Sequence, residues 1–185
     1  MRKTIQMISV LTIIGLVSGT VLVFTYKYAN PLILDNQKNE IKEAIFKIFP
    51  KADTYEKDII EDSVIFRAKE GGKLLGYAFL AEGNGYQGAI KMMAGIEPNL
   101  ETLVGIEILE SQETPGLGQE ITEEEFKAQF KGLMTSPKIT YVKNKPPERP
   151  NEIRAVTGAT VSSSAVVSIL NEKIKKLKNA LQKLR

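Results

Sequence analysis

The stretch that decides how this chain is organised reads Ala155-Val156-Thr157-Gly158-Ala159-Thr160-Val161-Ser162-Ser163-Ser164-Ala165-Val166-Val167. Five hydroxyl side chains lie within eight positions of it, beside a single glycine, and a helical pattern follows directly. The first N–H groups of a helix lack intrahelical partners and the helix dipole favours an anion, so such a cluster can hold a phosphate. An ordinary N-cap, with a Ser or Thr oxygen accepting from these groups, is the more common use. The rest of the chain has to decide between the two.

The helical pattern after this cluster is expected to run from about Ser163 to the end of the chain. Its apolar residues repeat at intervals of four and three, at Val166 or Val167, Leu170, Ile174, Leu177, Leu181 and Leu184. The other faces are rich in lysine. We expect the first half of the stripe to pack on a sheet. For the tail, packing, a partner helix and contact with anionic lipid all stay open.

The composition excludes several kinds of chemistry. The chain of 185 residues is long enough for one principal domain with a real core. It has neither Cys nor His, which removes disulfides, thiolate nucleophiles, Ser-His-Asp triads and Cys- or His-ligated metals. Carboxylate or lysine chemistry, or a bound organic cofactor, remains. The net charge of +3 is mild, and we expect no nucleic-acid partner.

The N-terminal segment predicts a membrane anchor. Residues 4–26 carry no charge and are dominated by Ile, Val and Leu, enough to cross a bilayer core as a helix. Aromatic residues of an interfacial belt follow within 24–28. A cleavable signal peptide is the alternative, but its apolar region would be shorter. Arg2 and Lys3 outweigh Lys27, so we expect a single-pass protein with a cytoplasmic N-terminus and an extracytoplasmic domain.

The remaining pattern predicts an α+β fold. We assign residues 1–30 to the anchor, 31–50 to an amphipathic connector helix that Pro50 ends, and 51–185 to the folded domain with its long C-terminal helix. Strand patterns at 64–68 and 74–80 flank Gly71-Gly72 as a hairpin, and strands at 89–96 and 103–108 follow. Together they predict a curved, mostly antiparallel sheet flanked by helices.

Shorter elements are expected between the sheet and the hydroxyl cluster. Residues 122–125 match a capping box that would open a helix carrying Phe126, Phe130 and Leu133. Residues 138–143 and 153–156 have strand character.

Three motifs together resemble a known family. They are Gly85-Tyr86-Gln87-Gly88-Ala89-Ile90, then Glu113-Thr114-Pro115-Gly116-Leu117-Gly118, then Thr157-Gly158-Ala159-Thr160 with Ser162-Ser163 following. Their order and spacing behind one N-terminal anchor resemble the FMN-binding domain of the G subunit of the Rnf complex. The C subunit of the sodium-pumping NADH:quinone reductase is a relative of that protein. The resemblance covers essentially the whole chain.

The resemblance implies a covalent flavin. In that family a separate flavin transferase joins FMN, through its phosphate, to the last Thr of the motif, which is Thr160 here. The loop Glu113, Thr114, Pro115, Gly116, Leu117 and Gly118 is expected to line the flavin ring, with Tyr86, Thr157, Gly158, Ala159, Ser162 and Ser163 as further binding residues. Arg154 departs from the family pattern, because an Asp is common there, and this bears on how the transferase reads the site.

The resemblance favours an electron-transfer subunit of a bacterial or archaeal membrane complex that couples electron flow between ferredoxin and NAD⁺ to ion translocation. Its partners would be other subunits, the flavin transferase and membrane lipid, with no catalytic residue of its own and no metal. A subunit of the sodium-pumping reductase, a membrane-anchored flavin-binding sensor or assembly protein, and a non-flavin interaction module remain as alternatives.

Overall fold

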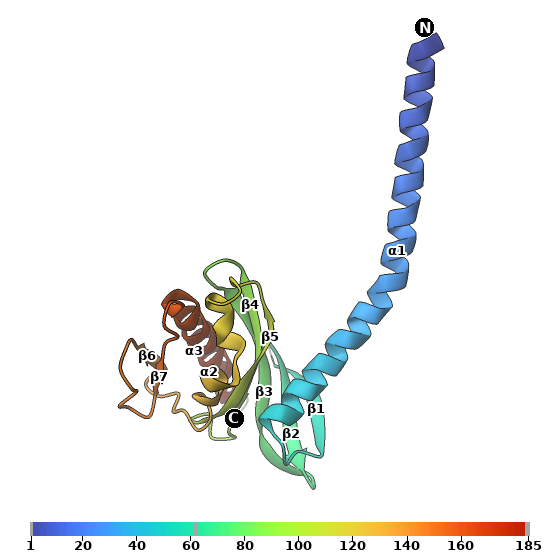
Figure 1. The fold of residues 1–185 in the computed structure, drawn as a ribbon. Coiled ribbons are helices and arrows are strands. Elements are labelled where there is room, and N and C mark those ends of the chain that lie inside the picture. Colours follow the sequence, from blue (N-terminus) through green and yellow to red (C-terminus); the bar gives the residue numbers. More distant parts are fainter. Residues whose placement is uncertain (1, 61–62, 184–185) are drawn as a thin grey trace. The chain divides into compact units, whose positions relative to one another are not determined.

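The computed structural model describes residues 2–60 and 63–183. The chain divides into two compact units, Met1–Glu40 and Ile41–Arg185. Figure 1 shows the order of the elements: a long N-terminal helix, five strands, a segment of short elements and a long C-terminal helix. The antiparallel sheet with flanking helices confirms the predicted α+β fold.

The first helix, α1 (Arg2–Ile48), is longer than either of the two helices predicted for this region. It continues through Pro31, although proline lacks the N–H that would complete the helical hydrogen bond to Lys27. An 18-residue window of α1 has a mean hydropathy of 2.4, so the helix is long and apolar enough to cross a membrane. Three of its threonine hydroxyls are hydrogen-bonded within the helix, because Thr12, Thr20 and Thr25 each donate to the carbonyl four residues earlier.

Five strands form one antiparallel sheet in sequence order. They are β1 (Thr54–Ile60), β2 (Ser63–Glu70), β3 (Lys73–Asn84), β4 (Ala89–Ile96) and β5 (Leu103–Ser111). The predicted hairpin is confirmed: Gly71 and Gly72 have φ of +55° and +83°, the paired positive values that a tight two-residue hairpin turn needs. β4 has the predicted bounds, whereas β5 extends three residues beyond the predicted 103–108.

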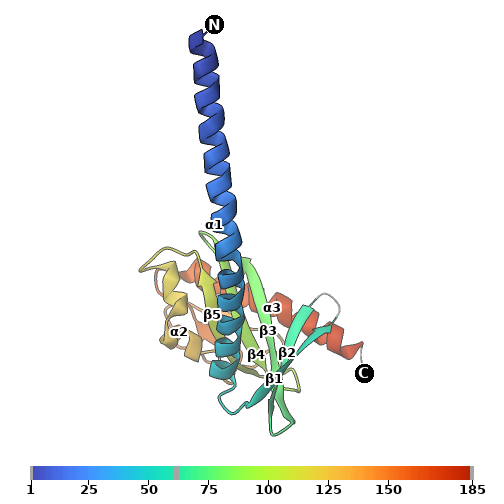
Figure 2. The same cartoon turned by 90° about the vertical axis from the view of Figure 1, so that its right-hand side faces the viewer.

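The central strands of the sheet are buried on both faces, and alternate residues of these strands enter two different cores. Phe79 and Met92 belong to a cluster with α3 (Thr160–Gln182), while the neighbouring Ala78 and Met93 belong to a second cluster with the last turns of α1. Figure 2 shows these last turns of α1 in front of the sheet and α3 behind it. Burial on both faces explains why residues 92–96 of β4 read as a continuous apolar run rather than an alternating one.

The segment after β5 is more irregular than predicted. It contains a short 3₁₀ helix, η1 (Gly118–Thr122), then α2 (Glu124–Ala128), then β6 (Thr140–Val142) and β7 (Glu152–Arg154), which pair in parallel. The predicted capping box is wrong, because the Thr122 hydroxyl donates to the Gln119 carbonyl and Glu123 is the N-cap. Phe126, Phe130 and Leu133 are buried as expected, although α2 ends at Ala128.

The C-terminal helix α3 begins at Thr160, three residues before the predicted start. Val166, Val167, Leu170, Ile174 and Leu177 of the predicted stripe are buried in the core beneath the sheet. Leu181 is partly buried against the same core, and Leu184 lies outside the described residues. The stripe therefore packs on the sheet as far as Leu181.

Candidate functional site

The three motifs that the sequence singled out meet at the side chain of Glu113, which is only 5% exposed. Its Oε1 accepts hydrogen bonds from the backbone N–H groups of Tyr86 (2.6 Å) and Gln87 (3.2 Å). Its Oε2 accepts from the hydroxyl of Ser162 in the first turn of α3 (2.7 Å). One carboxylate thus joins the loop between β3 and β4, the loop after β5 and the start of α3.

Glycine is required where backbone approaches this carboxylate. A Cβ atom at Gly85 would collide with Oε1 of Glu113, and one at Gly118 would collide with Oε2. Glycine provides the space because it has no Cβ. A further contact links the two loops, since the hydroxyl of Thr114 donates to the amide oxygen of Gln87. The close approach explains why glycines flank Tyr86 and end the Thr-Pro-Gly-Leu-Gly run.

The structure distinguishes the five hydroxyls of the cluster. Three serine hydroxyls are engaged within the protein: Ser162 donates to Glu113, Ser163 to the Ala159 carbonyl and Ser164 to the Val161 carbonyl. Within the described part of the chain, the hydroxyls of Thr157 and Thr160 have no hydrogen-bond partner. Thr157 is exposed, and Thr160, the first residue of α3, is half-buried. The two threonines are therefore the hydroxyls available to a ligand.

The N-terminus of α3 lacks the side-chain cap that the cluster led us to expect. Its N-cap is Ala159, which has no hydroxyl, and no side chain caps the first turn within residues 2–60 and 63–183. An ordinary N-cap by a Ser or Thr oxygen, the more common use of such a cluster, is therefore wrong for this helix. Gly158 just before the cap has φ of +84°, a left-handed conformation that favours glycine. First-turn N–H groups without a side-chain acceptor are the donors that an anion at a helix N-terminus uses.

Apolar side chains stand in solvent beside this helix start. Tyr86 is 72% exposed, Leu117 51% and Val161 54%. Leu117 lies against the backbone at Gly158, with its Cδ2 atom 3.5 Å from where a Cβ would be. Tyr86 and Leu117 were predicted from the motifs. Val161 was missed, and an apolar residue directly after the last threonine was the signal that could have found it.

A cleft of about 610 Å³ adjoins the site. Gly116 and Thr157 line it together with carboxylates from the segment after Gly118, namely Glu120, Glu123 and Glu125. Arg154 also lines the cleft, and its guanidinium pairs with Glu125 at 3.0 Å. The backbone of Arg154 is fixed as well, because its N–H donates to the Gln129 side chain (2.7 Å) and its carbonyl accepts from it (3.2 Å).

The predicted residues thus divide into two groups by what they touch. Glu113, Gly118, Ala159, Ser162 and Ser163 are buried. The hydroxyl of Ser162 is used by Glu113, so any contact of Ser162 with a ligand would use its backbone N–H. Thr114 is half-buried, and its hydroxyl bonds to Gln87. Tyr86, Thr157, Gly158, Thr160, Pro115, Gly116 and Leu117 are exposed or half-buried around the helix start. This arrangement suits a ligand with a phosphate at the helix N-terminus and a flat apolar body beside it.

Comparison with known proteins supports this assignment. Residues 85–175 match the model of the FMN-binding domain family. The chain is 30% identical over 182 residues to the G subunit of the ion-translocating oxidoreductase complex of Methanosarcina acetivorans, a match that covers 94% of each chain. The chain belongs to this family of G subunits. It contains an FMN-binding domain that includes all three motifs of the site.

Other relatives extend the family to bacteria. The G subunit of the proton-translocating ferredoxin:NAD(+) oxidoreductase complex of Clostridium ljungdahlii is 29% identical over 90% of this chain and 88% of its own length. The corresponding protein of the Na(+)-translocating ferredoxin:NAD(+) oxidoreductase complex of Acetobacterium woodii is 34% identical, over 62% of this chain and 55% of its own.

Solved structures share the fold. The crystal structure of NqrC from Shewanella oneidensis superposes with a TM-score of 0.56 and 24% identity, over 66% of this chain and 62% of that one. The C subunit of the Na(+)-translocating NADH-quinone reductase from Parabacteroides distasonis gives a TM-score of 0.53 and 25% identity, over 62% and 63%. These likenesses confirm the predicted relation of the fold to that of the reductase C subunits.

Proposed function

We propose that this chain is the electron-transfer G subunit of a membrane-bound, ion-translocating ferredoxin:NAD⁺ oxidoreductase complex of the Rnf type, and that it carries FMN as a phosphoester on Thr160. The FMN-binding domain and the relatives' names support the kind of subunit. The proposed attachment site rests on the hydrogen bonds of the hydroxyl groups. Helix α3 has no side-chain cap, and among the described residues of its first turn only Thr160 has a hydroxyl without a hydrogen-bond partner.

The residues around Thr160 fit FMN in three ways. In the ester, the Thr160 oxygen bonds to phosphorus in place of one phosphate oxygen substituent. The hydroxyl proton leaves with that oxygen, as water in the net balance with FMN or on the leaving group of an activated flavin donor held by the transferase. The one negative charge that remains faces first-turn N–H groups that no side chain caps. The helix dipole stabilises such a charge by about 0.3–1 kcal/mol. Gly158 leaves the phosphate space at the helix start, and the exposed side chains of Tyr86 and Leu117 offer apolar surface for the flavin ring.

The protein's own residues would position the cofactor. FMN supplies one- and two-electron transfer when bound. Glu113 holds the loops of Tyr86 and Leu117 at the start of α3. The side chains that would contact the flavin ring would therefore stay at a fixed distance from the N–H groups that would bind the phosphate. A covalent tether keeps the flavin on the protein while electrons pass to and from the partner subunits. A flavin transferase would complete maturation, and the apolar helix α1 would anchor the chain in the lipid bilayer.

Flavin attachment can be tested directly on the polypeptide. The full chain is expressed with and without a flavin transferase, denatured, separated by electrophoresis and examined for flavin fluorescence. Fluorescence is expected only with the transferase, and Thr160→Val should abolish it by removing the attacking hydroxyl while keeping the side-chain shape.

The matched control is Thr157→Val, which removes the other partner-free hydroxyl of the cluster, three residues earlier, and should leave most of the fluorescence. Flavin that stays on the denatured Thr160→Val chain would show that the attachment site lies elsewhere. Co-purification of the loaded protein with multi-span membrane subunits would separate an electron carrier from a sensor with the same domain.

A further inference from the structure

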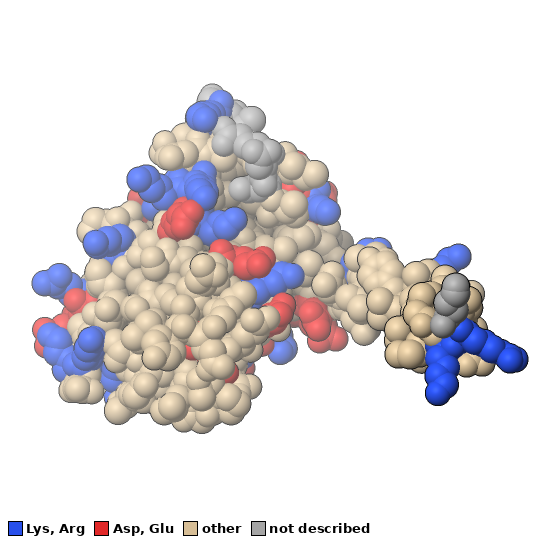
Figure 3. Space-filling model, turned by 90° about the horizontal axis from the view of Figure 1, so that it is seen from above, with Lys and Arg blue, Asp and Glu red and all other residues tan. Residues whose placement is uncertain are grey.

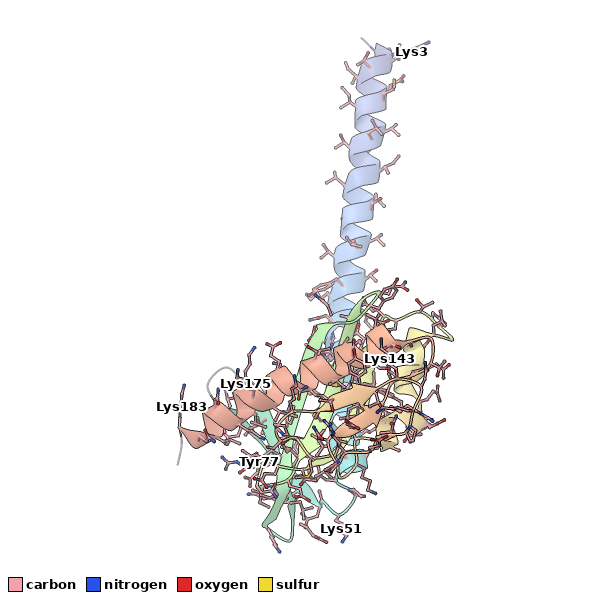
Figure 4. The ribbon with its side chains drawn as sticks, turned by 90° about the vertical axis from the view of Figure 1, so that its left-hand side faces the viewer. Lys3, Lys51, Tyr77, Lys143, Lys175 and Lys183 are labelled. Atoms are coloured by element: carbon pink, nitrogen blue, oxygen red, sulfur yellow. The ribbon has the colours of Figure 1, made fainter. Side chains whose placement is uncertain are left out.

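We propose that the far end of the domain holds a second binding site, a basic pocket that takes a phosphate group. The pocket has a volume of about 320 Å³, near the lower end of the range for small-molecule sites. Arg67 of β2, Tyr77 of β3 and Lys178 of α3 line it, with the turn after β4 closing one side. Figure 4 shows Tyr77 on the sheet side of the C-terminal half of α3.

This pocket is separate from the flavin site. Lys178 and Thr160 lie on the same helix, 18 positions apart, which corresponds to about 27 Å at ~1.5 Å per residue. None of the residues proposed to contact FMN lines the pocket among those described. The two sites therefore share no described lining residue.

Lys178 is held in place by neutral groups. Its ammonium donates to the hydroxyls of Thr135 (2.9 Å) and Ser136 (3.4 Å), and no carboxylate of the described residues lies within ion-pair distance. Thr135 is itself fixed, because it is 4% exposed and its hydroxyl lies 3.0 Å from the Leu100 carbonyl. An ammonium has three donors, so one remains for a ligand.

Arg67 is also incompletely satisfied. Its Nη2 pairs with Asp58, yet its Nε is buried without an acceptor among the described residues. Buried donors normally have partners, so the hydrogen bonding of this guanidinium is incomplete among the described residues. The side chain remains 40% exposed, so its other N–H groups can reach a ligand.

The lining favours a phosphate over a neutral ligand. The lining side chains include two cations, Lys178 and the Asp58-paired Arg67, and one carboxylate, Glu101, with further donors on Tyr77 and Gln182. These donors come from three elements, which suits the tetrahedral oxygens of a phosphate better than the two oxygens of a carboxylate. The volume exceeds what a bare phosphate fills, and Leu100 and Leu181 provide apolar wall, so the ligand would be a small organic phosphate or a phospholipid headgroup.

The test measures binding of inorganic phosphate and of glycerol 3-phosphate to the full chain in neutral detergent at low salt, by titration calorimetry. Glycerol 3-phosphate should bind the more tightly. Lys178→Gln and Arg67→Gln should each weaken binding about tenfold or more, the expected effect of losing one charge-assisted hydrogen bond. Lys178→Arg should keep affinity within a few-fold, because the charge and a donor remain.

Lys175→Gln is the matched control, since it removes the same charge from an exposed position of the same helix and should not change the affinity. Absence of binding to the unaltered chain, or equal affinity in Lys178→Gln, Arg67→Gln and the control, would overturn the proposal. Two sources of the phosphate are then separated in nanodiscs. A headgroup ligand predicts that phosphatidylglycerol discs weaken glycerol 3-phosphate binding relative to phosphatidylcholine discs, and a soluble ligand predicts equal binding in both.

Discussion

The buried carboxylate of Glu113 joins three segments of the site through the hydrogen bonds that it accepts. Burial of an ionised group is costly unless hydrogen bonds replace the lost water, and here two backbone N–H groups and one hydroxyl do so. Those donors belong to segments 27 and 49 residues away in the sequence. The Glu113 side chain thus holds two loops and the first turn of α3 together in one site.

Replacing Glu113 tests this at the level of one residue. Glu113→Ala should lower the free energy of unfolding by about 2–4 kcal/mol, because it leaves buried donors without acceptors. Glu113→Gln should cost only about 1 kcal/mol, since the amide oxygen can still accept from Tyr86 while its NH₂ group faces Ser162. Urea unfolding of the full chain in detergent gives both values.

The control for these variants is Glu120→Ala, an exposed carboxylate seven residues further along the chain, which should change stability by no more than about 0.5 kcal/mol. Equal stability of Glu113→Ala and the control would show that the buried carboxylate does not hold the loops.

The role of Glu113 could not be predicted from the sequence, although the residue itself was found. The resemblance places the loop from Glu113 to Gly118 near a flavin ring, which stays a prediction. The structure adds that the Glu113 side chain is buried and accepts a hydrogen bond from Ser162. Likewise the serines looked like helix caps, and only their distant or preceding partners show that Thr157 and Thr160 remain available. Sequence pattern finds which residues matter here, and tertiary contacts decide what each one does.

Among the elements, the short helix α2 is joined to the sheet by a charged cluster. Lys127 is 8% exposed, and its ammonium lies 3.1 Å from both carboxylate oxygens of Glu107 on β5 and 2.6 Å from Glu124. Burial alone would lower the pKa of Lys127, but hydrogen bonds and charge attraction from Glu124 and Glu107 outweigh it, and its pKa is raised above 10.5. The cluster therefore favours the charged lysine and stabilises the fold.

This cluster predicts a dependence of stability on alkaline pH. A group whose pKa is raised by folding stabilises the protein below its unfolded value, near 10.5 for Lys127, and loses that contribution as the pH rises through its folded value. Lys127→Met should cost about 1–3 kcal/mol at neutral pH, moderated because Glu107 keeps Lys47 as a partner. The stability difference between the two proteins should then shrink from about pH 10.5 upward.

Urea titrations of both proteins between about pH 7 and pH 12 measure this difference, and comparing the pair cancels the many other lysines and tyrosines that titrate there. Lys131→Met, at an exposed position beside the same cluster, serves as the reference with little effect at any pH. A gap between wild type and Lys127→Met that stays constant across the range would contradict the charge-based account.

The helices and strands were predicted correctly where turn residues and apolar pattern indicate the same element. The prediction failed where hydrogen bonds to other segments decide the local structure. The Gly71-Gly72 hairpin and the bounds of β4 follow from turn chemistry and apolar pattern, and both are confirmed. The capping box failed because Thr122 bonds to Gln119 within the preceding 3₁₀ helix, which the pattern did not reveal. The parallel pairing of β6 with β7 joins segments ten or more residues apart and had no local signal.

On the scale of the whole molecule, the two units differ in whether they contain a hydrophobic core. Both hydrophobic clusters lie within Ile41–Arg185, whereas almost all side chains of residues 2–40 are exposed. Figure 3 shows acidic and basic side chains interspersed over the upper face of the folded unit. Exposed apolar side chains at this density in the first unit fit a helix that is long and apolar enough to cross a membrane.

Removal of residues 1–40 should separate anchoring from folding. A chain of residues 41–185 should move from the membrane to the soluble fraction and keep its thermal midpoint within a few degrees, because both cores are retained. Fractionation and circular dichroism check the two outcomes. Retention of the shortened chain in the membrane fraction would show that a surface of the folded unit, rather than the helix, binds the bilayer.

The contact between Glu113 and Ser162 has a consequence for biogenesis. The hydroxyl-bearing helix start and the carboxylate that secures it are 49 residues apart, so no short peptide around Thr160 can reproduce the completed site. If the transferase acts on this assembled surface, flavin attachment reports folding, because a chain that carries flavin has already formed the contact between Glu113 and Ser162. If only flavinylated subunits are assembled into the complex, unfolded subunits would be excluded from it without a dedicated chaperone.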